Sequence, residues 1–383
     1  SGQQELHDCT MKRTGSSYGL AVDIGTTTVV MGLYDLGSGE RLAGLQEKNR
    51  QTILGADVMM RLMHCQRGSR QQLEQRIREQ LQDMAEQICN SYCTLEQVKT
   101  LTVVGNTTMC HIFLGQDVSG LAGSPFRPAY RGIYRCKGGD IGLQRMKCTD
   151  VIVPAGIDAH VGADAVSMIC ALQLQDTEDT VLAVDIGTNA EIALSCHGEI
   201  SVCSAPAGPA FEGAQISQGM RGEPGAIAGM HIAGQSGNIL LEVIPDDRRN
   251  IYPVKGICGS GLIDSIASLR QSDILQPDGY LLCDREEADR LGIPGYLRER
   301  ITEKGFLVYL DPGGQHVCLT QKDIRQFQLA KAAVQAGIRM LLEQKGLTLE
   351  QVDRLYIAGV FGGHISKKSA VLTGLFPDIV REK

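Results

Sequence analysis

The spacing of apolar and polar positions predicts several amphipathic helices. Apolar residues three and four positions apart predict a helix from about Arg70 to Tyr92. A second long helix is predicted from Lys322 to Lys345, with Ile324, Leu329, Val334, Ile338 and Leu341 on its apolar side. Shorter helices are predicted at 161–172, where small residues suit close packing, and at 262–269 after a glycine cluster.

Short apolar runs between these helices predict strands. Such runs lie at 101–105, which ends in a polar turn at 106–108, and at 151–154 and 352–363. Residues 205–237 are dense in Gly and Pro, which predicts irregular structure. A mixture of this kind is typical of an α/β protein.

One seven-residue pattern occurs twice. The run Leu-Ala-Val-Asp-Ile-Gly-Thr at 20–26 recurs, residue for residue, at 182–188. Each copy is followed by a second apolar run, at 29–34 and 191–195, so each predicts a β-hairpin whose turn carries Asp, Gly and hydroxyl groups. An exact repeat of this length indicates a duplicated lobe.

Both turns contain the residue types that bind phosphate. Glycine lets backbone N–H groups approach anionic oxygens, and the hydroxyls of Thr26, Thr27 and Thr28 add uncharged donors. Asp23 and Asp185, at the ends of the first strands, are suited to holding Mg²⁺ through its waters. An ordinary glycine hairpin would explain one copy, but two identical copies favour an Mg²⁺–ATP site gripped between two lobes.

Two further glycine clusters extend this prediction. Residues 259–261 begin a helix, where N–H groups and the helix dipole favour anions, and residues 359–363 follow a strand, where glycines would let adenosine lie against the backbone. The predicted nucleotide-binding residues are Gly25, Thr26, Thr27, Thr28, Asn106, Gly187, Thr188, Asn189, Glu212, Gly259, Ser260, Gly261, Gly359, Gly362 and Gly363.

Four polar residues have two interpretations each. Glu191 either orients an attacking water or the hydration shell of a cation, or is an exposed strand residue. Asn106 and Thr107 either reach the phosphate cleft or cap a turn, and Glu212 either bonds a ribose hydroxyl or is a surface acid. The predicted catalytic residues are Asp23, Asp185 and Glu191, and the predicted metal ligands are Asp23 and Asp185.

Composition narrows the range of functions. The net charge of −7 and an aromatic content of 4% with no Trp argue against binding to nucleic acid or to an anionic membrane surface. No apolar run is long enough to span a bilayer. Thirteen cysteines occur without a C-x-x-C motif, which is typical of free thiols in a reducing cytoplasm.

The order of these motifs resembles that of the acetate and sugar kinase, heat-shock and actin (ASKHA) superfamily. The resemblance runs from Tyr18 nearly to the end of the chain, with 161–172 as the connecting helix and 359–363 as the adenosine motif. It implies an α/β, two-lobed actin-like ATPase of ribonuclease H-like fold with duplicated lobes. The implied division is a polar lead-in at 1–17, a first lobe at 18–175, and a second lobe at 176–383 whose C-terminal end returns to the first.

Several longer strings look like those of the reductive activators of corrinoid proteins. The resemblance implies an enzyme, acting as a homodimer, that uses ATP and Mg to drive reduction of cob(II)alamin to cob(I)alamin. Its partner would be a corrinoid protein of a methyltransferase or O-demethylase system in an anaerobe. The matching strings are Val104 to Met109, Val161 to Asp164, Asp185 to Glu191, Ala205 to Ala214, Gly256 to Asp264 and Gln328 to Ala332.

The chain departs from that family at both ends. The cysteine pattern of an N-terminal ferredoxin-like domain with a two-iron two-sulfur cluster is absent, and family members continue past Lys383. We therefore expect a fragment that cannot transfer electrons by itself. Two rival functions are a small-molecule kinase of the same superfamily and a non-catalytic, actin-like nucleotide-binding module.

Overall fold

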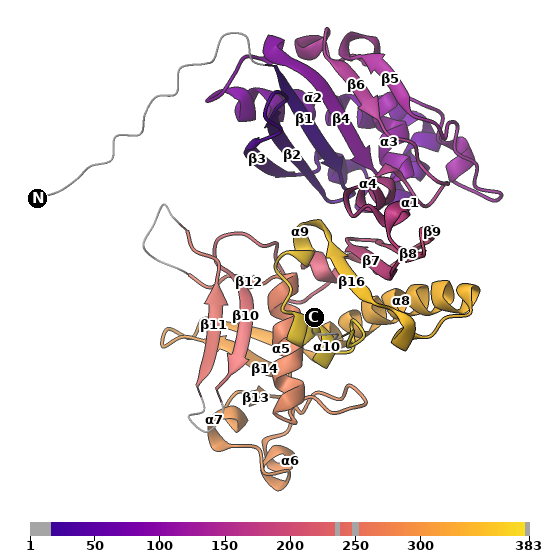
Figure 1. Ribbon diagram of the computed structural model, residues 1–383. Coiled ribbons are helices and arrows are strands. Elements are labelled where there is room, and N and C mark those ends of the chain that lie inside the picture. The colour runs from indigo at the N-terminus through magenta and orange to yellow at the C-terminus, as the bar shows by residue number, and fades with distance from the viewer. Residues whose placement is uncertain (1–16, 234–237, 247–252, 380–383) are drawn as a thin grey trace, which may run out of the picture. The chain divides into compact units, whose positions relative to one another are not determined.

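The computed structural model describes residues 17–233, 238–246 and 253–379. The chain divides into two compact units, with the boundary between Ala171 and Leu172 (Figure 1). Apart from Ser17, the predicted polar lead-in lies outside the described residues. The predicted boundary between residues 175 and 176 lies four residues after this division, in the segment before the second repeated hairpin.

The first unit is built on a six-stranded sheet. Its first three strands form an antiparallel meander, and the fourth strand pairs parallel with the first. The two predicted strands at 101–105 and 151–154 are confirmed within this sheet. The order is β3 (Arg41–Lys48), β2 (Thr28–Asp35), β1 (Tyr18–Ile24), β4 (Val98–Gly105), β6 (Asp150–Val153) and β5 (Tyr134–Lys137).

The helices of the first unit pack on this sheet. The predicted helix from Arg70 is confirmed as α2 (Arg70–Cys89), which packs on β2 and β3 with Leu73, Ile77, Leu81, Met84 and Ile88 buried. The predicted turn at 106–108 is instead the start of α3 (Thr107–Leu114), because Asn106 accepts a hydrogen bond from Met109 N–H as its N-cap. The other helices are α1 (Val58–His64) and α4 (Ala163–Ala171).

A four-stranded sheet in the second unit repeats the central part of the first. Its order, β16 (Arg354–Ala358), β7 (Thr180–Ile186), β8 (Ala190–Cys196) and β9 (Glu199–Ala205), matches β4, β1, β2 and β3. Again the meander is antiparallel and the strand beside the hairpin is parallel. The long helix α8 (Gln321–Lys345) packs on β8 and β9 as α2 packs on β2 and β3. The duplicated segment therefore consists of three strands, a helix and a fourth strand, in that order.

The buried side of α8 differs at one predicted position. Ile324, Val334, Ile338 and Leu341 are buried, but Leu329 is 65% exposed. A step of five residues from Ile324 rotates Leu329 away from the apolar face, and Phe327 takes its place in the core.

The second unit has a large insertion between β9 and α8. The prediction that 205–237 is irregular is wrong in part, because β10 lies within it and pairs with β11 and β12. The alternation of apolar and polar residues that would predict a strand is weak in β10, because small residues on both of its faces are buried. The inserted elements are η8 (Pro209–Glu212), β10 (Ala226–Ile232), β11 (Ile239–Val243), β12 (Gly256–Ile257), α5 (Gly259–Gln271), α6 (Arg285–Arg290), α7 (Gly295–Arg298), β13 (Ile301–Thr302), β14 (Gly305–Leu310) and β15 (His316–Thr320).

The end of the described chain stays in the second unit. The strand predicted to reach Gly363 ends at Ala358 and continues as the short helix α9 (Gly359–Gly362), because Gly359 adopts a left-handed φ of 78°. Helix α10 (Lys367–Leu372) packs on α5, and Leu375 and Phe376 join the core of this unit. The predicted return of the C-terminal end to the first lobe stays a prediction. No helix among the described residues combines the length and apolarity needed to cross a bilayer.

Candidate nucleotide site

The first repeated turn brings six of the predicted residues together. Asp23 lies at the end of β1 opposite Val30, and Thr28 begins β2. Gly25 has no room for a side chain, since a Cβ there would lie 2.6 Å from the Thr28 carbonyl oxygen. Asn106 donates from Nδ2 to Thr26 Oγ1 at 3.2 Å, so it both caps α3 and contacts the turn.

Two buried residues that sequence reasoning missed hold this turn from behind. Asn49 and Arg61 are both 0% exposed. Asn49 Nδ2 donates to the Gly25 carbonyl at 2.8 Å, and Arg61 Nη2 donates to the Thr26 carbonyl. A signal was available for Arg61, because it is a charged residue inside the otherwise apolar run of α1.

The second repeated turn is surrounded by carboxylates. Asp185 is half-buried at the end of β7, and its strand partner Glu191 is only 5% exposed. The interpretation of Glu191 as an exposed strand residue is therefore wrong: its Oε1 accepts a hydrogen bond from Ser204 Oγ at 3.0 Å. Desolvation by burial raises the pKa of the Asp185 carboxyl.

Glu212 also belongs to the second turn rather than to a surface loop. Its Oε1 accepts a hydrogen bond from Thr188 Oγ1 at 2.7 Å. Its Oε2 is buried and has no hydrogen-bond partner among the described residues. A buried carboxylate oxygen in this position is suited to a cation or a hydroxyl donor.

The predicted adenosine motif lies next to the second turn. Strand β16 runs parallel to β7 with Ala358 beside Asp185, so Gly359 follows directly. A Cβ on Gly359 would lie 2.2 Å from Asp185 Oδ1. Only glycine allows the chain to pass this carboxylate with the observed backbone conformation.

The remaining predicted cluster begins α5. Ser260 is buried, and a Cβ on Gly261 would lie 2.1 Å from the carbonyl oxygen of Ile227 on β10. Close packing of α5 on β10 therefore explains Gly261 structurally. Helix α5 also contacts η8, which carries Glu212. Anion binding by Gly259 and Ser260 stays a prediction.

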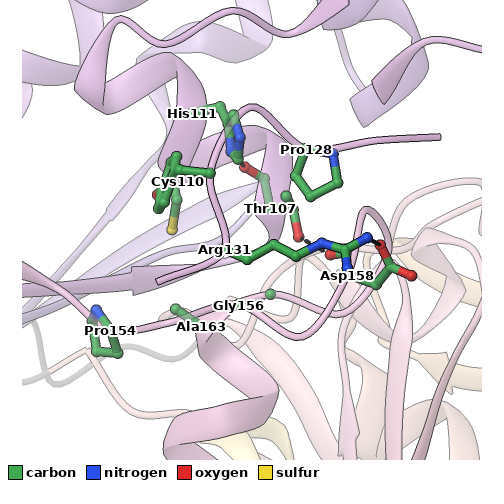
Figure 2. A pocket seen from close by; sticks show the side chains of 11 residues that line it. Thr107, Cys110, His111, Pro128, Arg131, Pro154, Gly156, Asp158 and Ala163 are labelled. Carbon is green, nitrogen blue, oxygen red and sulfur yellow. Dashed lines mark hydrogen bonds and ion pairs between the residues drawn. The ribbon is translucent and has the colours of Figure 1, made fainter. Parts of the chain in front are cut away.

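A separate, small and partly open pocket lies within the first unit (Figure 2). Figure 2 shows Arg131 reaching across it to Asp158, with Nη2 to Oδ1 at 3.0 Å. His111 Nε2 accepts from Ala129 N–H at 3.1 Å, so its Nδ1 carries the proton donated to the Thr107 carbonyl at 2.7 Å. Desolvation lowers the pKa of this neutral imidazole. The pocket is lined by none of the predicted nucleotide residues, but Thr107 connects it to Asn106.

Carboxylates of the two repeated turns belong to different units. Within the described ranges, no three His, Cys, Asp or Glu side chains gather into one metal-binding group. The donor set of the second turn, with its orphaned Glu212 oxygen and half-buried Asp185, nevertheless fits a hard cation better than the cationic surroundings of the first turn.

Each of the two units matches a protein-family profile. One family profile, described as the RACo middle region, matches residues 18–177. A second profile, described as the C-terminal domain of RACo, the ASKHA domain, matches residues 179–383. The chain belongs to the RACo family. Its α/β fold is accordingly the actin-like ASKHA fold that the motif order predicts, and the resemblance to reductive activators is confirmed.

Individual RACo-like proteins agree with this assignment. The chain is 33% identical over 374 residues to the corrinoid activation enzyme RamQ of Eubacterium limosum, covering 94% of this chain and 60% of that protein. It is 27% identical over 379 residues to a [Co(II) methylated amine-specific corrinoid protein] reductase of Methanosarcina barkeri, covering 95% and 67%. A solved reductive activator for corrinoid, iron–sulfur protein matches 96% of this chain and 57% of its own, with 32% identity and a TM-score of 0.83.

Proposed function

We propose that this chain binds and hydrolyses Mg–ATP as the nucleotide-driven part of a reductive activator of corrinoid proteins. The observation that carries the proposal is the second turn, where Asp185, Glu212 and Gly359 come together from three separate segments. One relative is named a corrinoid activation enzyme and another a reductase of a corrinoid protein, which supports the choice of partner.

The residues of the second turn have distinct proposed tasks. Gly359 lets the chain pass close to the Asp185 carboxylate, and adenosine would lie against the glycine-rich segment that begins there. Glu212 holds the Thr188 hydroxyl in place and directs its second oxygen into the interior. Asp23 and Asp185 are the proposed carboxylates for Mg²⁺, which would neutralise phosphate charge when bound.

Glu191 is the proposed residue for orienting water. It is buried on β8 directly opposite Asp185, and Ser204 fixes one of its oxygens. A carboxylate held in one rotamer can accept a hydrogen bond from water and restrict its direction of attack. Its contribution would therefore be to hydrolysis rather than to nucleotide affinity.

Coupling to corrinoid reduction requires the longer protein. The chain spans 60% of the length of RamQ, so the activity of a whole activator comes to it only as a proposal. We propose that ATP binds two conformations of the chain unequally and thereby changes its affinity for the corrinoid protein. The electron would come from an iron–sulfur domain outside this sequence. A methyltransferase or O-demethylase partner, a homodimer and a cytoplasmic location stay predictions.

Calorimetric titration with ATP, with and without Mg²⁺, tests the nucleotide part. We expect binding that depends on Mg²⁺ and is lost in Asp185→Ala. Glu199→Ala is a matched control, because this exposed acid of the same unit pairs with Lys345. Equal binding by wild type and Asp185→Ala would contradict the proposed site.

The corrinoid part is tested in the full-length enzyme, by following the cob(II)alamin absorbance of a corrinoid protein under a low-potential reductant. ATP should increase the yield of cob(I)alamin. An unchanged yield, together with unchanged affinity for the corrinoid protein, would show that coupling to reduction is wrong even if ATP binds.

A further inference from the structure

The backbone carbonyls of the first turn all point toward donors outside it. The Gly25 oxygen accepts from Asn49 Nδ2 at 2.8 Å, and the Thr27 oxygen accepts from Asn49 N–H at 2.9 Å. Between them, the Thr26 oxygen accepts from Arg61. A carbonyl oxygen facing a phosphate would repel it, so this arrangement removes three repulsive dipoles from the turn.

Arg61 is a fully buried cation. Besides Thr26, its Nε donates to the Gly55 carbonyl at 3.1 Å and its Nη1 donates to Gln51 Oε1 at 3.1 Å. Burial lowers the pKa of Arg61 to about 10, an effect that the charge of Asp57 partly opposes, so the guanidinium is still protonated at neutral pH. None of the ion pairs formed among the described residues includes Arg61.

A buried charge that forms no direct ion pair is unfavourable, and its hydrogen bonds alone do not require a charged donor. Neutral Asn49 holds the two neighbouring carbonyls by the same kind of contact. Besides its hydrogen bonds to Gly55 and Gln51, a guanidinium at the third carbonyl adds a fixed positive charge directly behind the turn. That charge becomes favourable when an anion is present on the other side of the turn.

We infer that Arg61 is a positioning residue that prepares the first turn for the phosphates of a nucleotide. This inference rests on the proposed function. Arg61 acts through Thr26, by holding its carbonyl away from the phosphate and by supplying the charge that compensates the phosphate oxygens. It does not touch the nucleotide itself.

The test compares the affinities for ATP and for adenosine, both measured by calorimetry in the presence of Mg²⁺. Arg61→Met and Arg61→Gln remove the charge and fill much of the same space. In each, ATP affinity is expected to fall at least about tenfold, whereas adenosine affinity stays within about twofold of wild type. Arg61→Lys keeps the charge, so it should recover most of the ATP affinity.

Arg78→Gln is the matched control. Arg78 belongs to the same unit, has a side chain only 16% exposed, and donates to the Phe113 carbonyl at 2.8 Å, but it lies on α2 away from the turn. Its ratio of ATP to adenosine affinity should stay at the wild-type value.

The outcomes separate this inference from the proposed function. If wild type does not bind ATP, the proposed function is wrong. If wild type binds ATP and a folded neutral variant of Arg61 keeps the ATP-to-adenosine ratio, only the positioning role is wrong. Equal losses of ATP and adenosine affinity would also overturn it, since they would indicate a general structural role.

Discussion

The two repeated turns have seven identical residues in sequence but opposite electrostatic surroundings. In the first unit, the turn is held by Asn49 and by the buried cation Arg61. In the second unit, the corresponding turn contacts Glu212 and is flanked by the buried carboxylate Glu191. The corresponding aspartates also differ, because Asp23 is exposed whereas Asp185 is half-buried.

We propose that this difference gives the two turns different tasks in the proposed nucleotide site. A turn backed by a positive charge favours phosphate, and a turn surrounded by carboxylates favours a metal ion. The seven shared residues supply a backbone shape that suits either ligand. The residues that distinguish the turns come from other segments of each unit, so selection could change them independently.

The two aspartates provide the largest test of this comparison. We expect Asp23→Asn and Asp185→Asn each to reduce ATP turnover about 100-fold, since each removes a carboxylate proposed to act on the metal. Only Asp185→Asn should raise stability without nucleotide. Burial raises the pKa of Asp185, so its ionised form destabilises the folded state at neutral pH, and the neutral amide removes that penalty.

Turnover assays and thermal unfolding without nucleotide would check both parts. Full ATP turnover by Asp23→Asn would contradict a catalytic role for the first turn. A lower melting temperature for Asp185→Asn would contradict the stability argument.

Two glycines provide the test of this comparison with the next largest expected effect. Gly105 is the last residue of β4, and Gly359 directly follows the corresponding strand β16. A Cβ would meet the Ile24 carbonyl oxygen at 2.7 Å in the first case and Asp185 Oδ1 at 2.2 Å in the second. Gly359→Ala should destabilise the second unit by about 2 to 3 kcal/mol, through backbone strain and displacement of the carboxylate.

Gly292→Ala is the control for strain alone, because Gly292 has a φ of 75° and nothing within 4 Å of a Cβ. Its expected effect is about 1 kcal/mol. Urea unfolding measures both variants. If the two substitutions are equally destabilising, the close approach to Asp185 has no energetic importance.

The unpartnered oxygen of Glu212 predicts a smaller, metal-specific effect. Glu212→Gln keeps an oxygen for the Thr188 hydroxyl but removes the charge beside the second turn. We expect the increase in ATP affinity that Mg²⁺ produces to shrink about tenfold, which is about 1.4 kcal/mol. Affinity measured in EDTA should change little, and an equal loss with and without Mg²⁺ would argue against a role in holding the metal.

Acidification should destabilise α3, whose N-cap contacts the first turn, and should leave the second turn unchanged. This effect should be smaller than those of the three sets of substitutions above. His111 lies on α3, whose N-cap Asn106 contacts Thr26, and burial lowers the pKa of His111 below its usual 6.5. The unfolded chain therefore binds the proton more readily. Stability is full above pH 6.5 and declines as the pH falls through the interval down to the folded-state pKa.

Hydrogen exchange at pH 7.5 and 5.5 would measure this effect on α3, with the amides of α8 as an internal reference. Exchange on α3 should accelerate more than on α8 at the lower pH, and His111→Asn should abolish that difference. An equal acceleration in both helices would contradict the role of His111.

The sequence alone determined the parts of this protein that depend on local periodicity. Alternating and helical spacings predicted the β1–β2 and β7–β8 hairpins, and the helices α2 and α8, because each pattern lies within one element. The exact repeat predicted the duplication, and the order of the motifs predicted the actin-like fold. For the same local reason, Asp23 and Asp185 were placed at strand ends, and Thr26 and Thr188 on the turns that follow.

Only the tertiary structure decided which side chains surround those turns. Arg61 contacts Thr26 across 35 positions of sequence, Asn106 contacts it across 80, and Glu212 contacts Thr188 across 24. No spacing in the sequence encodes such pairs, because they depend on how strands and helices pack after they form. The sequence therefore made the two turns look alike, whereas packing supplied a cation to one and carboxylates to the other.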